Sequence, residues 1–168
     1  MTVSETAGDA ELGVQEPKVG VQELGHLVLY VHDIERSAAF YGDALGWRRI
    51  TPEGSGAPVA AFSGGRTHHE LLLIEVGPNA TEIPEGRRVG LYHFGLKVGD
   101  TDEELKAMLD KIRAAGVRIV GASDHTVTHS LYILDPDGNE IELYVDVAGA
   151  DWRADPTMLL TPTKPLRL

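Results

Sequence analysis

Residues 25–47, GHLVLYVHDIERSAAFYGDALGW, decide the fold because they predict a strand followed at once by a helix. β-branched and aromatic residues mix with leucine over 24–31, which is typical of a strand. Asp33 is placed to cap a helix over 34–45, where apolar residues recur at helical spacing, and Gly46 ends that helix. Three further strands are expected over 47–51, 58–63 and 68–76. The predicted order of elements is β-α-β-β-β.

The same order recurs from residue 91. Residues 91–98, LYHFGLKV, predict a strand, and 102–115 predict a helix whose start carries Thr101 and Glu104 as a capping box. The segments VRIVGA, HSLYILD and NEIELYVDV predict three further strands, with the turn DPDGN (135–139) setting the register of the last two. The chain is therefore predicted to contain an internal duplication.

This duplication predicts the domain organisation. The predicted class is α+β, with two βαβββ modules whose first strands come together so that two histidines converge on one cavity. The composition of the first residues, rich in Glu, Gly, Ala and Thr without periodicity, predicts a flexible tail. Trp152 and the apolar residues near the end of the chain are expected to anchor an irregular extension. The expected segments are a tail over 1–22, modules over 23–77 and 91–147, a linker over 78–90 and an extension over 148–168.

Composition narrows the class of function. The 168 residues carry a formal net charge of −11, which repels phosphate backbones and anionic membranes, so nucleic acid and membrane are not expected partners. The chain has no cysteine, so any metal must be held by His, Asp or Glu. No secretory signal and no membrane-spanning run is visible, which favours a cytoplasmic protein acting on a small molecule.

His26 and His93 occupy equivalent positions near the start of each module. Glu142 lies between Ile141 and Leu143 in a strand suited to burial. An unpaired carboxylate there would pay a desolvation penalty of several kcal/mol, so we expect it to bind a cation. Two imidazoles and one carboxylate can form a facial triad that leaves half of an octahedral ion open. That arrangement suits Fe(II) chemistry on oxygen, and also Mn(II). The residues predict a metal site of His26, His93 and Glu142.

The segments GHLVLYVHDIERSAAFYGDALGW, RTHHELLLIEV, LYHFGLKV and DHTVTHSLYILDPDGNEIELYVD resemble the vicinal oxygen chelate superfamily over about residues 24–146. Within it the chain is most similar to small type I extradiol (catechol 2,3-dioxygenase-type) dioxygenases. The resemblance implies that the two modules form a curled mixed sheet around a metal site. It also implies that the predicted triad holds iron and that His69, the second residue of a His-His pair, is the acid/base. It further implies that His125 and Tyr132 donate hydrogen bonds to bound oxygen or substrate. The implied substrates are dioxygen and a catechol, such as a degradative catechol or L-DOPA, and the implied assembly is a homo-oligomer, a dimer or higher.

Two other functions remain open at this point. A glyoxalase I-type lyase or isomerase has a fourth protein ligand, a Glu on the last strand of the first module. The aligned position here is Leu72, although Glu70 lies two residues away on the same strand face. A small-molecule-binding resistance protein is the other alternative, but such proteins usually lack the ligand histidines. His32 and His129 are expected at surface or structural positions.

Overall fold

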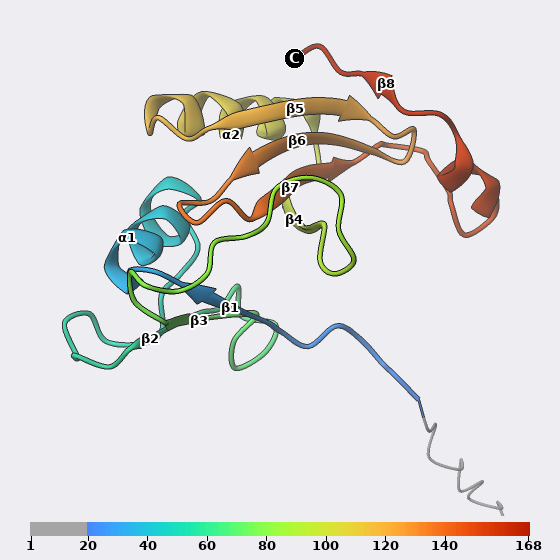
Figure 1. The fold of residues 1–168 in the computed structure, drawn as a ribbon. Coiled ribbons are helices and arrows are strands. Elements are labelled where there is room, and N and C mark those ends of the chain that lie inside the picture. The colour runs from blue at the N-terminus through green and yellow to red at the C-terminus, as the bar shows by residue number, and fades with distance from the viewer. Residues whose placement is uncertain (1–19) are drawn as a thin grey trace, which may run out of the picture.

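In the computed structural model, residues 20–168 are described and form two separate sheets (Figure 1). The first module contains β1 (Leu27–Val31), α1 (Ile34–Ala39), a π-helical turn (Phe40–Ala44), β2 (Val59–Phe62) and β3 (Leu71–Glu75). Its three strands are ordered β1-β3-β2, with β1 parallel and β2 antiparallel to β3. The predicted tail falls almost wholly outside the described residues.

The strand expected over 47–51 is reduced to an isolated bridge between Arg49 and Phe62. The segment still runs beside β2, since the Ile50 amide donates to the Ala61 carbonyl at 2.8 Å. The Ala61 amide, however, donates to the Thr51 side-chain hydroxyl at 3.2 Å. A side chain thus takes the place of a backbone acceptor, which interrupts the ladder of a regular strand.

The second module supplies the larger sheet. It contains β4 (His93–Gly99), α2 (Asp102–Ala114), β5 (Ile119–Asp124), β6 (Thr128–Leu134) and β7 (Glu140–Asp146). The strand order is β4-β7-β6-β5-β8, where β4 is parallel to β7 and the other pairs are antiparallel. Thr101 and Glu104 form the predicted capping box at the start of α2.

The C-terminal extension differs in part from the expectation. Trp152 does not anchor it, because its side chain is 43% exposed and lies under the Arg153 guanidinium. The extension is attached instead by β8 (Lys164–Pro165), which pairs with the free edge of β5, and by Leu166, which packs on the core. A short 3₁₀ helix (Pro156–Leu160) precedes this strand.

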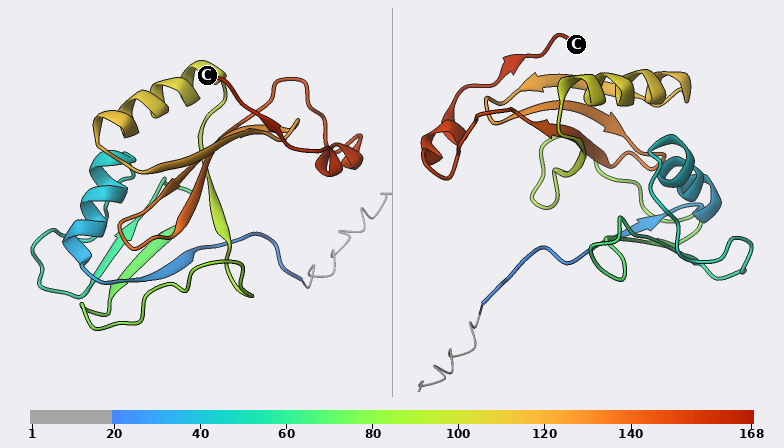
Figure 2. Two further views of the ribbon diagram at one scale, coloured as in Figure 1. Left: turned by 45° about the horizontal axis from the view of Figure 1, so that its top comes forward. Right: turned by 180° about the vertical axis from the view of Figure 1, so that it is seen from behind.

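Apolar side chains bind the helices to the sheets. Leu105, Leu109 and Ile112 recur along one face of α2 and are buried. They pack with strand residues of the larger sheet into one cluster that also includes Tyr41 and Phe62 of the first module. Both helices lie on the outer side of the molecule (Figure 2), so the sheet faces that they leave uncovered are available for a site.

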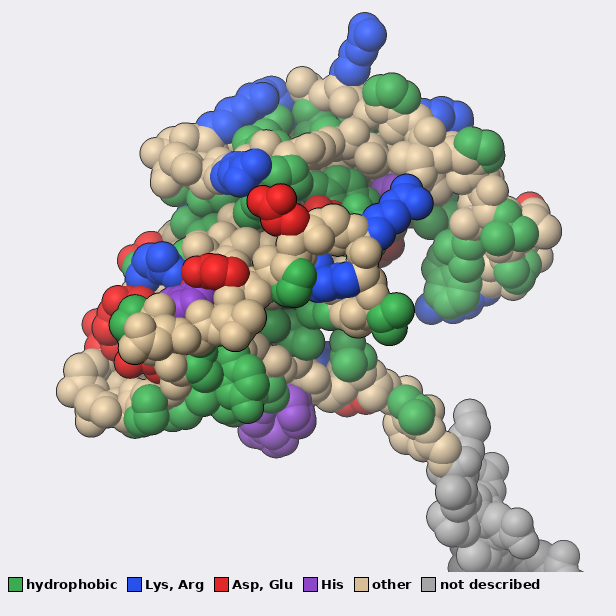
Figure 3. All heavy atoms as spheres, in the orientation of Figure 1, with side chains coloured by type: hydrophobic (Ala, Val, Ile, Leu, Met, Phe, Trp, Pro, Cys, Tyr) green, Lys and Arg blue, Asp and Glu red, His purple; other side chains and the backbone are tan. Residues whose placement is uncertain are grey.

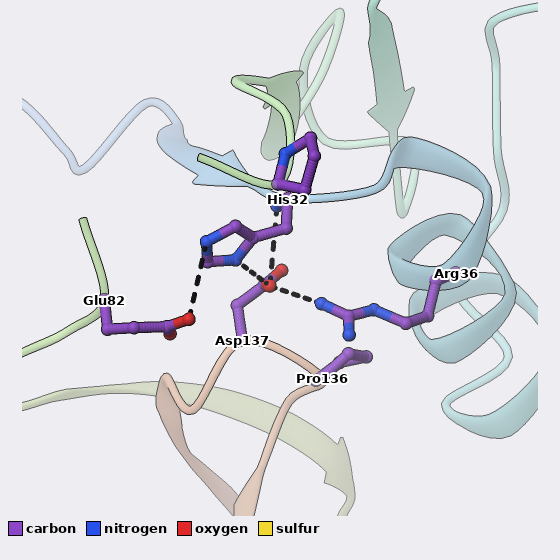
Figure 4. Close-up of a pocket in the computed structure, with 6 residues that line it drawn as sticks. His32, Arg36, Glu82, Pro136 and Asp137 are labelled. Carbon is purple, nitrogen blue, oxygen red and sulfur yellow. Dashed lines mark hydrogen bonds and ion pairs between the residues drawn. The ribbon is translucent and has the colours of Figure 1, made fainter. Parts of the chain in front are cut away.

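The two modules contact each other where α1 and the π-helical turn after it meet the DPDGN turn. The buried Tyr41 hydroxyl donates to Asp135 Oδ2 at 2.7 Å. His32 Nδ1 lies 2.7 Å from Asp137 Oδ1, and Arg36 donates to the same oxygen (Figure 4). The sequence predicted this turn only as the connection that sets the register of two strands. In the structure it also holds the two modules together. We call these contacts of His32, Arg36 and Tyr41 with Asp135 and Asp137 the module junction.

Within residues 20–168 the two sheets stay separate and do not join into one curled sheet. Among the described residues, β1 pairs only with β3 and β4 pairs only with β7, so each is an edge strand. The predicted βαβββ architecture is present as two modules, each with its own sheet.

Among residues 20–168, no helix has the length and apolar character needed to span a membrane.

Candidate metal centre

The predicted site residues lie in two groups on different modules. His26, His68 and His69 form the first group, which we call the histidine cluster. The second group lies on the larger sheet and is called the carboxylate cluster; it contains Glu142 with His93, His125, Ser130 and Tyr132. Each group lies next to an edge strand, β1 for the first and β4 for the second.

The histidine cluster lies where β1 and β3 begin. His26 directly precedes β1, and the His26 and His69 rings are 4.6 Å apart between centroids. His68 and His69 approach at 2.6 Å between their Nδ1 atoms. Burial, together with the neighbouring rings of His68 and His26, lowers the pKa of His69, because each disfavours another positive charge. Figure 3 shows histidine side chains protruding from this half of the molecule.

Glu142 is the centre of the carboxylate cluster. Its Oε1 accepts hydrogen bonds from the Ser130 hydroxyl at 2.6 Å and from the Tyr132 hydroxyl at 3.3 Å. Its Oε2 lies 3.3 Å from His93 Nε2. The antiparallel register of β6 and β7 places Tyr132 opposite Glu142, and β4 places His93 beside them. One carboxylate oxygen is thus held by hydroxyls while the other faces an imidazole.

Tyr132 links Glu142 to His125. Its hydroxyl lies 2.7 Å from His125 Nε2, and His125 Nδ1 lies 3.3 Å from the Thr163 hydroxyl of the C-terminal extension. Burial and the adjacent Glu142 carboxylate raise the pKa of Tyr132 well above its ordinary value. The phenol therefore keeps its proton near neutral pH and donates it in the hydrogen bond to Glu142.

The pair of His93 and Glu142 has the geometry of two ligands of one cation. Ligand atoms bonded at about 2.1 Å and at right angles are separated by about 3 Å, close to the 3.3 Å observed. The buried Nδ1 of His93 has no hydrogen-bond partner among residues 20–168 and lies 3.6 Å from Glu140 Oε1. An imidazole protonated at Nδ1 would direct that proton toward Glu140 and leave Nε2 free to bind a metal.

His26 does not join these two ligands within one chain. In residues 20–168 no three His, Asp or Glu side chains converge closely enough to hold a metal ion. Of the three expected ligands, only His93 and Glu142 lie close enough together in this chain to bind the same divalent metal. His26 lies instead with His69, the expected acid/base, so the sequence-predicted residues are divided between the two clusters.

Glu70 is not available as the additional ligand that a glyoxalase-type site requires. Its carboxylate accepts hydrogen bonds from the amides of Gly64 at 2.8 Å and of Arg66 and Thr67 at 3.1 Å. Burial raises the pKa of Glu70, but these amide donors outweigh it and hold the pKa below its ordinary value. Glu70 thus closes the loop between β2 and β3.

Three residues around the site were not singled out from the sequence. Ser130 and Thr163 are small polar residues whose contacts arise only from tertiary packing, so their positions carry no local signal. Glu140 lies two residues from Glu142 on the same strand face, and that alternation was the available signal. As expected, His32 and His129 have structural partners: Asp137 for the first and Asp102 for the second.

The fold agrees with comparisons to known proteins. Residues 23–143 match the model of the Glyoxalase/Bleomycin resistance protein/Dioxygenase superfamily. The chain belongs to this superfamily. Its fold is similar to that of a glyoxalase/dioxygenase from Nostoc punctiforme, with a TM-score of 0.60 and 22% identity over 87% of this chain and 99% of that one.

Two curated members of the superfamily represent different activities. The chain is 36% identical over 132 residues to a catechol-2,3-dioxygenase of Bacillus subtilis, an alignment that covers 79% of this chain and 44% of the relative. It is 32% identical over 123 residues to a probable lactoylglutathione lyase of Synechocystis, covering 70% of this chain and 91% of the relative. The chain therefore spans less than half of the dioxygenase and most of the lyase.

Proposed function

We propose that this superfamily member is a metal-dependent extradiol dioxygenase that cleaves the ring of a catechol with dioxygen. The observation that carries the proposal is the pairing of Glu142 with His93 beside the hydrogen-bonded Tyr132 and His125. The 36% identity to a catechol-2,3-dioxygenase supports the same reaction class. The substrate class is a catechol or a substituted catechol such as L-DOPA.

The proposed metal is Fe(II), with Mn(II) as the other candidate, held by His26, His93 and Glu142. Such an ion supplies a Lewis acid that binds adjacent hydroxyls of a substrate and reacts with dioxygen.

The carboxylate cluster is suited to a substrate that carries negative oxygen. Tyr132 keeps its proton, which it donates to Glu142 here and would donate to a substrate oxygen after the hydroxyl turned, with His125 on its far side. Ser130 holds Glu142 Oε1 so that Oε2 faces His93. These contacts fix the ligand oxygen before any substrate binds, and such preorganisation is a general source of catalytic power.

His69 is the proposed acid/base. Its lowered pKa favours the neutral imidazole near neutral pH, a form that accepts a proton from a catechol hydroxyl and returns it later. In one chain His69 lies beside His26 rather than beside Glu142. Its role therefore depends on the histidine cluster meeting the carboxylate cluster.

A lactoylglutathione lyase-type reaction is the second candidate, because the chain covers 91% of the Synechocystis relative at 32% identity. That reaction moves a proton on a thiol adduct and, in the glyoxalase I pattern, uses a fourth protein ligand. Glu70 is engaged with three backbone amides, which weighs against this candidate.

Anaerobic loading with Fe(II), followed by catechol or L-DOPA and air, tests the proposal. We expect oxygen uptake together with a yellow ring-fission product, and neither signal from Glu142→Gln. The parallel assay supplies the thiol adduct with Ni(II) or Zn(II). Lyase turnover in that assay without any ring cleavage in the first would replace the dioxygenase by the second candidate.

A further inference from the structure

We infer that Thr163 is a positioning residue for the candidate metal centre and that it acts through His125. The inference rests on the proposed function for its effect on turnover, and it assigns a role to the C-terminal extension, residues 148–168. This extension lies outside residues 23–143, which match the superfamily model. The role therefore comes from a part of this chain that the superfamily pattern does not include.

The pairing of β8 with β5 places Thr163 opposite His125. The two strands are antiparallel and Asp124 pairs with Lys164, so the same register continues to His125 and Thr163. Directly opposite residues of antiparallel strands bring their side chains within reach of each other. The Thr163 hydroxyl accordingly lies 3.3 Å from His125 Nδ1. Figure 1 shows this last segment of the chain beside β5, at the edge of the larger sheet.

The segments that carry these two side chains are each held in place separately. The His125 amide donates to the Thr128 carbonyl at 2.9 Å, which fixes the backbone where β5 turns toward β6. Leu166, three residues after Thr163, packs on the hydrophobic core. The contact between Thr163 and His125 therefore joins two anchored segments.

The hydrogen bonds that run from Thr163 to Glu142 fit together in one direction only. The ionised Glu142 carboxylate can only accept, so Tyr132 donates its one hydroxyl proton to Oε1 at 3.3 Å. The Tyr132 oxygen then accepts from His125 Nε2, which lies 2.7 Å away. If the phenol donated to His125 instead, two oxygens without a proton between them would face each other at 3.3 Å.

This direction determines what His125 requires at its other ring nitrogen. A neutral imidazole carries one proton, so a proton on Nε2 leaves Nδ1 as an acceptor. Among residues 20–168, the side-chain donor within reach of Nδ1 is the Thr163 hydroxyl. Thr163 thereby favours the form of His125 whose proton points to Tyr132. Without this donor, a proton on Nδ1 would be solvated by water, and Nε2 would draw the Tyr132 proton away from Glu142.

The consequence reaches the expected metal ligand. Glu142 Oε1 would keep the Ser130 hydroxyl as a donor at 2.6 Å but would lose the Tyr132 hydroxyl. Hydrogen-bond partners of metal ligands typically contribute 10- to 100-fold to metal affinity or activity. Because Thr163 acts from two side chains further away, we expect its loss to lower turnover by about tenfold, at the small end of that range.

Nitrogen NMR of the ¹⁵N-labelled full chain, purified without added metal, tests the inference. The ring ¹⁵N shifts of a histidine report which nitrogen carries the proton, and a His125→Gln spectrum identifies the His125 signals. At about pH 8, where an ordinary histidine is neutral, we expect the wild-type proton on Nε2. Thr163→Val removes the donor and keeps the shape of the side chain, so the form protonated at Nδ1 should appear. Thr163→Ser should restore the wild-type spectrum.

Thr161→Val is the matched control. It makes the same change two residues earlier in the extension, at a hydroxyl without a hydrogen-bond partner among the described residues. We expect the wild-type form of His125 and wild-type turnover from this variant. Thr163→Ala replaces Thr163→Val if the latter fails to fold.

The position of the His125 proton separates this inference from the proposed function, because it needs neither metal nor catechol. The expected spectra from a protein that cleaves no catechol would support the contact of Thr163 with His125 and remove the dioxygenase. A wild-type proton on Nδ1, or a Thr163→Val spectrum equal to that of the wild type, would overturn the role of Thr163. In an active enzyme, wild-type turnover by Thr163→Val would overturn it as well.

Discussion

The hydroxyl of Tyr41 in the first module donates a 2.7 Å hydrogen bond to Asp135 in the second, and both side chains are buried. This bond joins the π-helical turn after α1 to the turn between β6 and β7. It therefore ties the two modules together through residues that belong to neither the histidine cluster nor the carboxylate cluster. The relative position of the histidine and carboxylate clusters is therefore set by a contact that takes no part in either.

Tyr41→Phe should destabilise the chain. The change leaves the Asp135 carboxylate with one donor fewer in a buried place, so we expect the free energy of unfolding to fall by about 1–3 kcal/mol in a urea titration. Tyr144→Phe is the matched control, since the Tyr144 hydroxyl makes no hydrogen bond to the described residues and its loss should change stability by less than about 0.5 kcal/mol. Equal effects of the two changes would contradict the junction.

His32 should make the stability of the module junction depend on pH. Its hydrogen bond to Asp137, and next the Ala80 carbonyl, raise the pKa of His32 above 6.5. A raised pKa means that the folded state binds the proton more tightly than the unfolded state. The stabilisation of the folded state by His32 is therefore complete below about pH 6.5 and is lost as pH rises through the raised pKa. Glu82 and Arg36 also face this ring around a pocket of about 270 Å³ (Figure 4).

Thermal unfolding of wild type and His32→Gln at several pH values checks this. The wild type should exceed the variant by the largest margin at acidic pH, and the margin should shrink above neutrality. His129→Gln serves as a control on an exposed partner, Asp102. A margin that grows with pH would show that the proton weakens the junction.

His93 and His69 should respond differently to replacement. His93→Ala removes a ligand, so bound metal should fall by more than about tenfold, and turnover with it. His69→Ala should keep the metal but lose about 10²- to 10⁴-fold in turnover, the usual contribution of a general acid/base. Metal analysis and oxygen uptake measured on the same samples separate the two effects. Normal turnover by His69→Ala would remove its assigned role.

Glu70→Ala should affect stability and leave metal binding unchanged. The carboxylate accepts three amide hydrogen bonds, so we expect a loss of about 1–3 kcal/mol in the free energy of unfolding. Glu53→Ala in the exposed loop before β2 is the control. A variant that folds like the wild type but no longer retains metal would identify Glu70 as a ligand and favour the lyase.

Much of the second module could be predicted from the sequence because its signals are local. The capping box at Thr101 and Glu104 and the buried face of α2 fix the helix, and alternation along 140–146 placed Glu142 on the uncovered face. His125 and Tyr132 were expected from the resemblance to bind oxygen or substrate, and the structure adds a contact of 2.7 Å between them on adjacent segments. These features depend on residues close in sequence or on adjacent strands.

Other features depend on packing between distant parts and gave no such signal. His68 and His69 were expected on a strand, but they precede β3 because Glu70 and Ser63 close a loop there. The roles of Asp135 and Asp137 at the module junction follow from where α1 lies. The separation of His26 from Glu142 arises in the same way, since residue patterns indicate ligands but not whether one copy brings them together.

Anomalous diffraction from crystals of the metal-loaded protein tests the central claim most directly. We expect one divalent ion per chain, bound by His26, His93 and Glu142, with open positions on its remaining side. An ion bound by Glu70, or one that contacts neither His93 nor Glu142, would contradict it.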